Sequence, residues 1–166
     1  MASQWYSLVS QKLFLASTLL ARLEPGVTDD NAGRNPAAEK EALSQGATEL
    51  LLRARQLLLV MVARCHQHKS ETPGSLAELE ALFPYEVYEV QLLKQLSETP
   101  ESWWHHLDQL EAALRQPPVT RKNVTSENII AISVEPGPDR SVAGLNKTLA
   151  EITKLARTIE DQHGEW

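Results

Sequence analysis

The sequence predicts an all-α protein: a helical bundle built on three long amphipathic helices, with shorter covering helices and one extended β-prone segment. Two observations support this fold class. Apolar residues recur at intervals of three and four over three long segments, a spacing that places them on one face of a helix. Leucine dominates the apolar residues, whereas aromatic residues make up only 5% of the chain, and leucine together with Ala, Glu, Gln and Arg favours helix.

The first long helix is expected from about Ser3 to Leu23. Pro25 and Gly26 end it, because neither residue continues a helix easily, and a loop should follow over residues 27–35. The apolar face of this helix consists of residues that step by three and four along the chain: Tyr6, Val9, Leu13, Ala16, Leu20 and Leu23.

The second long helix is expected to begin at Asn35-Pro36, since asparagine is a good N-cap and proline suits the first helical position. No strong helix breaker follows before residues 70–74. A helix of that extent would be roughly 50 Å long at 1.5 Å per residue. Gly46 is the weak point inside it, because glycine costs about 1 kcal/mol relative to alanine in a helix interior.

Three shorter helices are expected between the second long helix and residue 118. The first begins with a capping box formed by Ser75 and Glu78. The second is expected over residues 85–97, although its tyrosines and valines also favour a strand. The third should begin at Thr99-Pro100 and end at Pro117-Pro118.

Residues 119–140 are expected to form an extended connector. Within it, Asn128 to Val134 is rich in β-branched residues and is followed by the breaker Pro136-Gly137-Pro138. One strand cannot form a sheet alone. Three arrangements therefore stay open: the segment packs over the bundle, pairs with an undetected strand, or pairs with another chain.

The last long helix, about Ser141 to His163, has the most regular apolar spacing in the chain. The spacing is that of a short coiled-coil seam of about three heptads. We therefore expect a single helical domain over residues 1–166, with a main helical part (1–118), the extended connector (119–140) and a C-terminal helix (141–166). The seam residues are Val142, Leu145, Leu149, Ile152, Ala156 and Ile159.

Several features together resemble small bacterial helical proteins of an uncharacterised family. These are the opening Trp5-Tyr6 with the apolar repeat around it, the long second helix, and the terminal helix that ends near Trp166. The resemblance extends over most of the chain and includes no diagnostic motif. It implies an all-helical fold and assigns no activity and no functional residues.

The charge distribution argues against a nucleic-acid partner. The net charge is −6, and the segment from Glu71 to Glu111 holds nine acidic residues and one basic residue, Lys94. Nucleic-acid-binding surfaces need clustered lysine and arginine. The lone Cys65 fits a reducing compartment, and the longest apolar run, residues 57–63, is far shorter than the about 20 residues that span a bilayer. We therefore expect a cytoplasmic protein without membrane contact.

The segment from Arg64 to His68 is the most suggestive of chemistry. Cys65 and His68 lie at i and i+3 on one helix face, a spacing that metal ligands use. A structural zinc site needs four ligands, however, and neither a second cysteine nor a paired-histidine motif supplies them. The simpler interpretation is that Cys65 ends an apolar stripe while the histidines lie at a helix C-terminus, where positive charge is favoured. We therefore predict no metal, cofactor or catalytic residue.

The function predicted from these features is non-enzymatic: protein–protein interaction as an adaptor, a regulator or a self-associating module. The partner is another protein or a second copy of the chain. Trp104 points about 100° away from Trp103 on its helix, towards the edge of the apolar stripe or solvent, and exposed aromatic residues are enriched at binding hot spots. The alternative is a helical enzyme or a nucleotide- or nucleic-acid-handling domain that uses the Arg64–His68 patch. The candidate partner-binding residues are Trp104, Tyr88, Ile129, Ile130, Ile132 and Trp166.

Overall fold

The computed structural model describes residues 3–26, 35–117 and 137–164, and every regular element within these ranges is an α-helix. The all-α prediction is therefore confirmed for this part of the chain. None of the helices described is long and apolar enough to cross a membrane.

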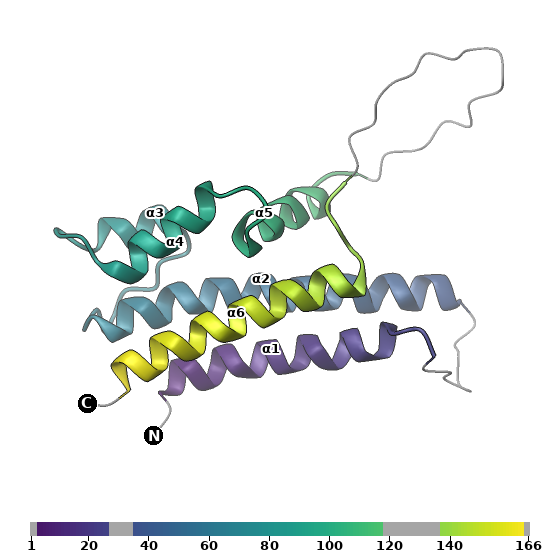
Figure 1. The fold of residues 1–166 in the computed structure, drawn as a ribbon, viewed down its shortest axis with the longest axis horizontal. Helices are drawn as coiled ribbons and strands as arrows, with labels where there is room; N and C mark the ends of the chain where they lie inside the picture. The colour runs from purple at the N-terminus through teal and green to yellow at the C-terminus, as the bar shows by residue number, and fades with distance from the viewer. Residues whose placement is uncertain (1–2, 27–34, 118–136, 165–166) are drawn as a thin grey trace, which may run out of the picture.

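Three helices form one layer of the molecule: α1 (Gln4–Leu23), α2 (Pro36–Cys65) and α6 (Val142–His163). Figure 1 shows them lying side by side, and each of the three contacts the other two. Because their apolar residues recur at helical spacing, the inward faces close over a common core. Its fully buried side chains include Val9, Ala16, Leu20, Leu51, Leu58, Leu145, Ile152 and Ile159.

The shorter helices α3 (Leu76–Ala81), α4 (Tyr88–Glu98) and α5 (Trp103–Leu114) form a second layer along α2, opposite α1 (Figure 1). Helices α3 and α5 contact α2 directly, and α4 packs against α3 and α5. The apolar side chains that this layer buries include Leu79, Val90, Leu93, Leu107 and Leu110. The start of α4 lies close to the C-terminal end of α2, since Glu89 Oε2 of α4 is 3.1 Å from His66 Nε2.

Gly46 lies where α1 and α2 approach each other closely. A Cβ atom at this position would lie 3.1 Å from Leu19 Cδ1 of α1. Glycine disfavours the helix at this position, but because it has no side chain it lets the two long helices pack closely.

Three of the predicted helix starts are confirmed by their capping hydrogen bonds. In each case a side-chain oxygen of the N-cap accepts a hydrogen bond from a backbone N–H in the first turn, which would otherwise be unpaired. The N-cap residues are Asn35 for α2, Ser75 for α3 and Ser141 for α6.

The predicted start of α5 at Thr99-Pro100 is wrong. Thr99 belongs to the end of α4, where its hydroxyl donates to the carbonyl oxygen of Gln95 at 2.7 Å. Ser102 is the N-cap of α5, and its Oγ accepts a hydrogen bond from the N–H of His105 at 3.1 Å. Between the two caps, Glu101 has a φ of 65°, so the chain turns before the new helix begins.

Helix α2 ends at Cys65, earlier than predicted, because Gln67 adopts a left-handed φ of 69°. The N–H of Gln67 donates to the carbonyl of Arg64 at 3.1 Å, and the N–H of His68 donates to the carbonyl of Ala63 at 3.0 Å. This pair of bonds is the Schellman motif, in which glycine normally takes the left-handed position. A glutamine there gives no sequence signal for a helix end.

Candidate functional site

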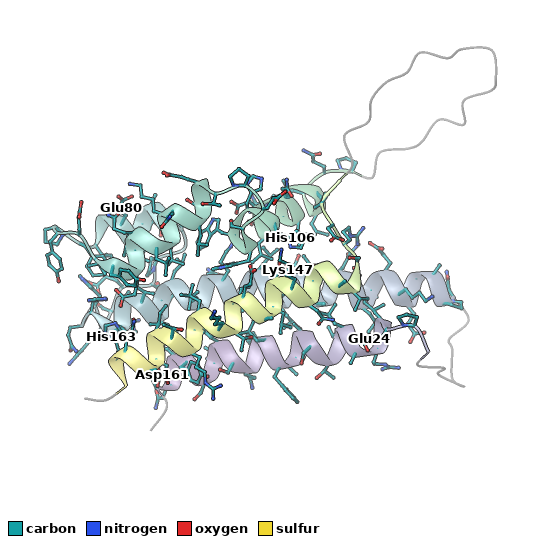
Figure 2. The ribbon with its side chains drawn as sticks, viewed as in Figure 1. Glu24, Glu80, His106, Lys147, Asp161 and His163 are labelled. Carbon is teal, nitrogen blue, oxygen red and sulfur yellow. The ribbon has the colours of Figure 1, made fainter. Side chains whose placement is uncertain are left out.

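Three titratable side chains from separate helices meet at one end of the molecule. His66 directly follows α2, Glu89 lies in the first turn of α4, and His163 is the last residue of α6. The Glu89 carboxylate accepts a hydrogen bond from His66 Nε2 at Oε2 (3.1 Å) and one from His163 Nε2 at Oε1 (2.6 Å). We call these residues the His–Glu–His cluster, and Figure 2 labels His163 at the end of α6.

Glu89 is a nearly buried carboxylate, with only 7% of its side chain exposed. The N-cap of α4 is Val87, whose side chain has no hydrogen-bond acceptor, and Glu89 itself accepts a hydrogen bond from its own backbone N–H. Burial raises the pKa of the Glu89 carboxyl, but the hydrogen bonds from His163, from this N–H and from His66 outweigh burial and hold the pKa below its usual value. Glu89 is therefore an ionised carboxylate between two imidazoles at neutral pH.

The imidazole rings of the cluster are held by packing as well as by hydrogen bonds. The ring centroids of His66 and His163 lie 5.1 Å apart, with an angle of 69° between the planes. Phe83 packs edge-on against His66, with the centroids 5.3 Å apart. Both rings therefore have a fixed position relative to the carboxylate.

The side chains of the Arg64–His68 patch have separate partners. Arg64 Nη1 donates to the carbonyl oxygens of His68 and of Glu71, the latter at 2.8 Å, and the guanidinium lies over the Trp5 ring, 5.0 Å from its centroid. Whereas His66 turns to Glu89, His68 packs on Phe83 with the ring centroids 4.9 Å apart. Arg64 thus holds the turn that follows α2, and this turn directs His66 into the cluster.

Cys65 lies beside the cluster in a protonated state. Burial first, and then the negative charges of Glu160 and Glu89, raise the pKa of the Cys65 thiol to about 11. The thiolate is the form of cysteine that attacks substrates and binds metals. The environment of Cys65 therefore does not favour a nucleophilic role.

Glu160, one turn before His163, ties the end of α6 to the start of α1. The backbone N–H of Ser3 donates to Glu160 Oε1 at 2.5 Å, and the Ser3 hydroxyl donates to Oε2 at 2.8 Å. The same hydroxyl oxygen accepts the capping hydrogen bond from the N–H of Tyr6. Glu160 therefore fixes the N-cap of α1 and, with it, the end of α6 that holds His163.

The second layer exposes two tyrosines among acidic side chains. Tyr85 is 63% exposed and Tyr88 is 67% exposed. They border two adjoining hollows of 390 and 360 Å³ that share Gln91 and Lys94. Lys94 is paired with Glu80 at 2.8 Å. We call this surface the tyrosine face and define it by Tyr85, Glu86, Tyr88, Gln91 and Glu98.

Among the predicted partner-binding residues, Tyr88 is exposed and Trp104 is not. Trp104 is only 6% exposed; its ring packs against Trp103 with the centroids 5.5 Å apart, and the guanidinium of Arg55 covers it at 4.9 Å. The expectation that Trp104 faces solvent is wrong, because Arg55 reaches across from α2 and covers its ring. The remaining candidates lie outside the described residues: Ile129, Ile130, Ile132 and Trp166.

Glu89 and His163 were not predicted from the sequence as members of a cluster. His66 and Glu89 are 23 residues apart, and Glu89 and His163 are 74 residues apart, so no local spacing connects them. The available signal is partial: His163 ends the last predicted helix and the histidines of residues 66–68 are expected at a helix C-terminus, whereas Glu89 falls inside the helix predicted over residues 85–97.

Comparison with known proteins gives a family and no activity. The model of a family described as Family of unknown function (DUF6586) matches residues 1–166, and the chain belongs to this family. The resemblance to an uncharacterised family is thereby confirmed. No curated protein and no solved structure matches the chain.

Proposed function

We propose that this DUF6586 protein is a non-enzymatic binding module whose tyrosine face recognises a basic segment, rich in arginine or lysine, of another protein. The observation that supports the proposal is the exposure of Tyr85 and Tyr88 beside carboxylates on the α3–α4 layer. Exposed tyrosine is a frequent anchor at protein interfaces.

The chemistry of the tyrosine face suits a cationic partner. An arginine or lysine placed over an exposed aromatic ring gains about 0.5–1 kcal/mol. Glu86 and Glu98 add electrostatic complementarity, which speeds association and excludes acidic partners. Lys94 pairs with Glu80, so its charge is partly compensated. A chain that presents several cations in sequence is therefore the expected ligand.

The alternative function, which uses the Arg64–His68 patch, has less support. The guanidinium of Arg64 is already bonded to backbone carbonyls and stacked on Trp5. A nucleic acid at this end of the molecule would also meet the acidic residues of the second layer, whose charge repels phosphate.

Selection of binding peptides tests the proposal. A random peptide library is panned on the wild-type chain, on Tyr88→Ala and on Phe14→Ala, a matched control that removes an equally exposed aromatic ring from α1. Wild type and Phe14→Ala are expected to enrich peptides rich in arginine and lysine. For a selected peptide, fluorescence anisotropy is expected to show at least about tenfold weaker binding to Tyr88→Ala, as for the loss of a hot-spot ring. Binding should weaken as salt is added.

Two outcomes would contradict the proposal. One is a set of selected peptides without basic residues, and the other is unchanged binding by Tyr88→Ala. Sedimentation at several protein concentrations examines self-association separately. A dimer that Phe14→Ala abolishes would place the principal contact on α1, with a second copy of the chain as the partner.

A further inference from the structure

We infer that the His–Glu–His cluster is a binding site for a divalent transition-metal ion, with Zn²⁺ as its preferred occupant. This site goes beyond the proposed function and does not depend on it. His66, Glu89 and His163 each offer one ligand atom, and no two of these atoms are more than 4.8 Å apart. Imidazole nitrogen and carboxylate oxygen are both common zinc ligands.

The positions of the three atoms are close to those that a single ion requires. Ligand atoms bonded to a tetrahedral zinc ion at about 2.1 Å lie roughly 3.4 Å from one another. The atoms of the cluster therefore need to move by about 1 Å or less to hold an ion at that bond length. Each imidazole would then carry its proton on Nδ1 and direct the Nε2 lone pair to the metal. This change of tautomer leaves the charge of a neutral imidazole unchanged.

The surroundings favour a metal ion over an ordinary surface ion pair. The Glu89 carboxylate is nearly buried, and low water exposure strengthens its attraction to a cation. Phe83 and the two imidazoles pack edge to face, so the ligands are already oriented before the ion enters. Two imidazoles with one carboxylate favour zinc over calcium and magnesium, which prefer oxygen ligands. Three protein ligands leave the fourth position for water.

A bound ion would have a mechanical effect on the fold. Its ligands come from the end of α2, the first turn of α4 and the end of α6, so the ion would join the two layers at one end of the molecule. Because Val87 cannot cap α4 with its side chain, this helix start is the element that the ion would stabilise most.

Zinc titration of the untagged chain of residues 1–166 tests the site. The protein is stripped with a chelator, dialysed, and titrated with zinc chloride in competition with a chromophoric chelator. We expect one Zn²⁺ per chain, a melting temperature that rises with zinc concentration, and a visible absorption band when Co²⁺ replaces zinc. In the wild-type chain, NMR signals of the His66 and His163 rings should shift on zinc addition, while those of His106 should not.

Variants assign the ligands. His163→Ala and Glu89→Gln are each expected to weaken zinc binding at least about 100-fold, because even changes next to a ligand cost 10–100-fold. His68→Ala, which removes an imidazole that packs on Phe83 outside the cluster, should bind zinc like wild type. Far-UV circular dichroism checks that each variant is folded. Absence of stoichiometric zinc binding by wild type, or zinc-induced NMR shifts of other histidine rings without shifts of His66 and His163, would overturn the assignment even if a variant fails to fold.

Discussion

Arg55 attaches the second layer to α2, and its replacement by methionine measures how much this contact contributes to the free energy of unfolding. Its Nη1 donates to Asp108 at 2.5 Å and its Nη2 to Glu111 at 2.8 Å. The guanidinium also lies 4.9 Å from the ring centroid of Trp104. Methionine keeps an unbranched apolar stem near the indole but removes the charge and all the donors, so the difference between Arg55→Met and wild type reports on the guanidinium itself.

The expected cost follows from the exposure of the partners. Although the Arg55 side chain is only 12% exposed, Asp108 is 48% and Glu111 is 33% exposed, so both carboxylates return to water when the guanidinium is removed. Each ion pair is therefore worth about 0.2–1 kcal/mol, the range for exposed pairs. The contact with a buried indole adds about 0.5–2 kcal/mol. The free energy of unfolding should fall by about 1–4 kcal/mol in total.

Urea unfolding followed by circular dichroism provides the assay. Arg55→Met should lower the midpoint at an unchanged m value. Arg115→Met is the matched control, because Arg115 also pairs with Glu111, at 2.7 Å, but is 77% exposed; its loss should cost no more than about 0.5 kcal/mol. If Arg55→Met were as stable as wild type, or if Arg115→Met lost as much free energy of unfolding, the guanidinium of Arg55 would not stabilise the second layer as described.

Three further predictions concern the first layer. Leu51→Ala should lower the free energy of unfolding by about 2–5 kcal/mol, because it opens a cavity at a fully buried position; a loss below about 1 kcal/mol in the same urea titration would contradict the packing described. Gly46→Leu should cost about 1–3 kcal/mol by overpacking, since even a Cβ there meets Leu19 at 3.1 Å; an unchanged midpoint would show that α1 can move away. Cys65 should react slowly with iodoacetamide at about pH 8 and faster as the pH rises, because the thiolate reacts and the folded pKa is about 11. The thiol ionises at lower pH in the unfolded chain, so the free energy of unfolding should fall as the pH rises towards the folded pKa. Equal iodoacetamide reaction rates for the folded and the urea-unfolded protein would show that folding does not raise the pKa of the thiol.

Helix starts were largely predictable from the sequence because an N-cap is a local arrangement. Asn35, Ser75 and Ser141 each bond a backbone N–H three residues ahead. The start of α5 was not predictable, because Thr99 and Ser102 are both good caps and only the three-dimensional structure decides between them. Thr99 is bonded to the preceding helix, which leaves Ser102 to begin the next one.

The candidate site was not predictable because it depends on contacts between remote segments. His66 points to Glu89 only because α2 ends at a left-handed Gln67, a conformation that glutamine does not signal. The burial of Trp104 likewise depends on Arg55, a residue of another helix. Periodicity identifies which face of a helix is apolar, but it does not specify which helix end meets which.

The hydrogen bonds between Ser3 and Glu160 also bear on the order of folding. They join residues 157 positions apart, whereas α1 and α2 are connected by residues 24–35 alone. Long loops cost more entropy to close, and non-local contacts form slowly. The α1–α2 hairpin is therefore expected to form first, and α6 to dock on it afterwards. Since His163 arrives with α6, all three zinc ligands would come together only in this last step, and zinc affinity would measure how complete folding is.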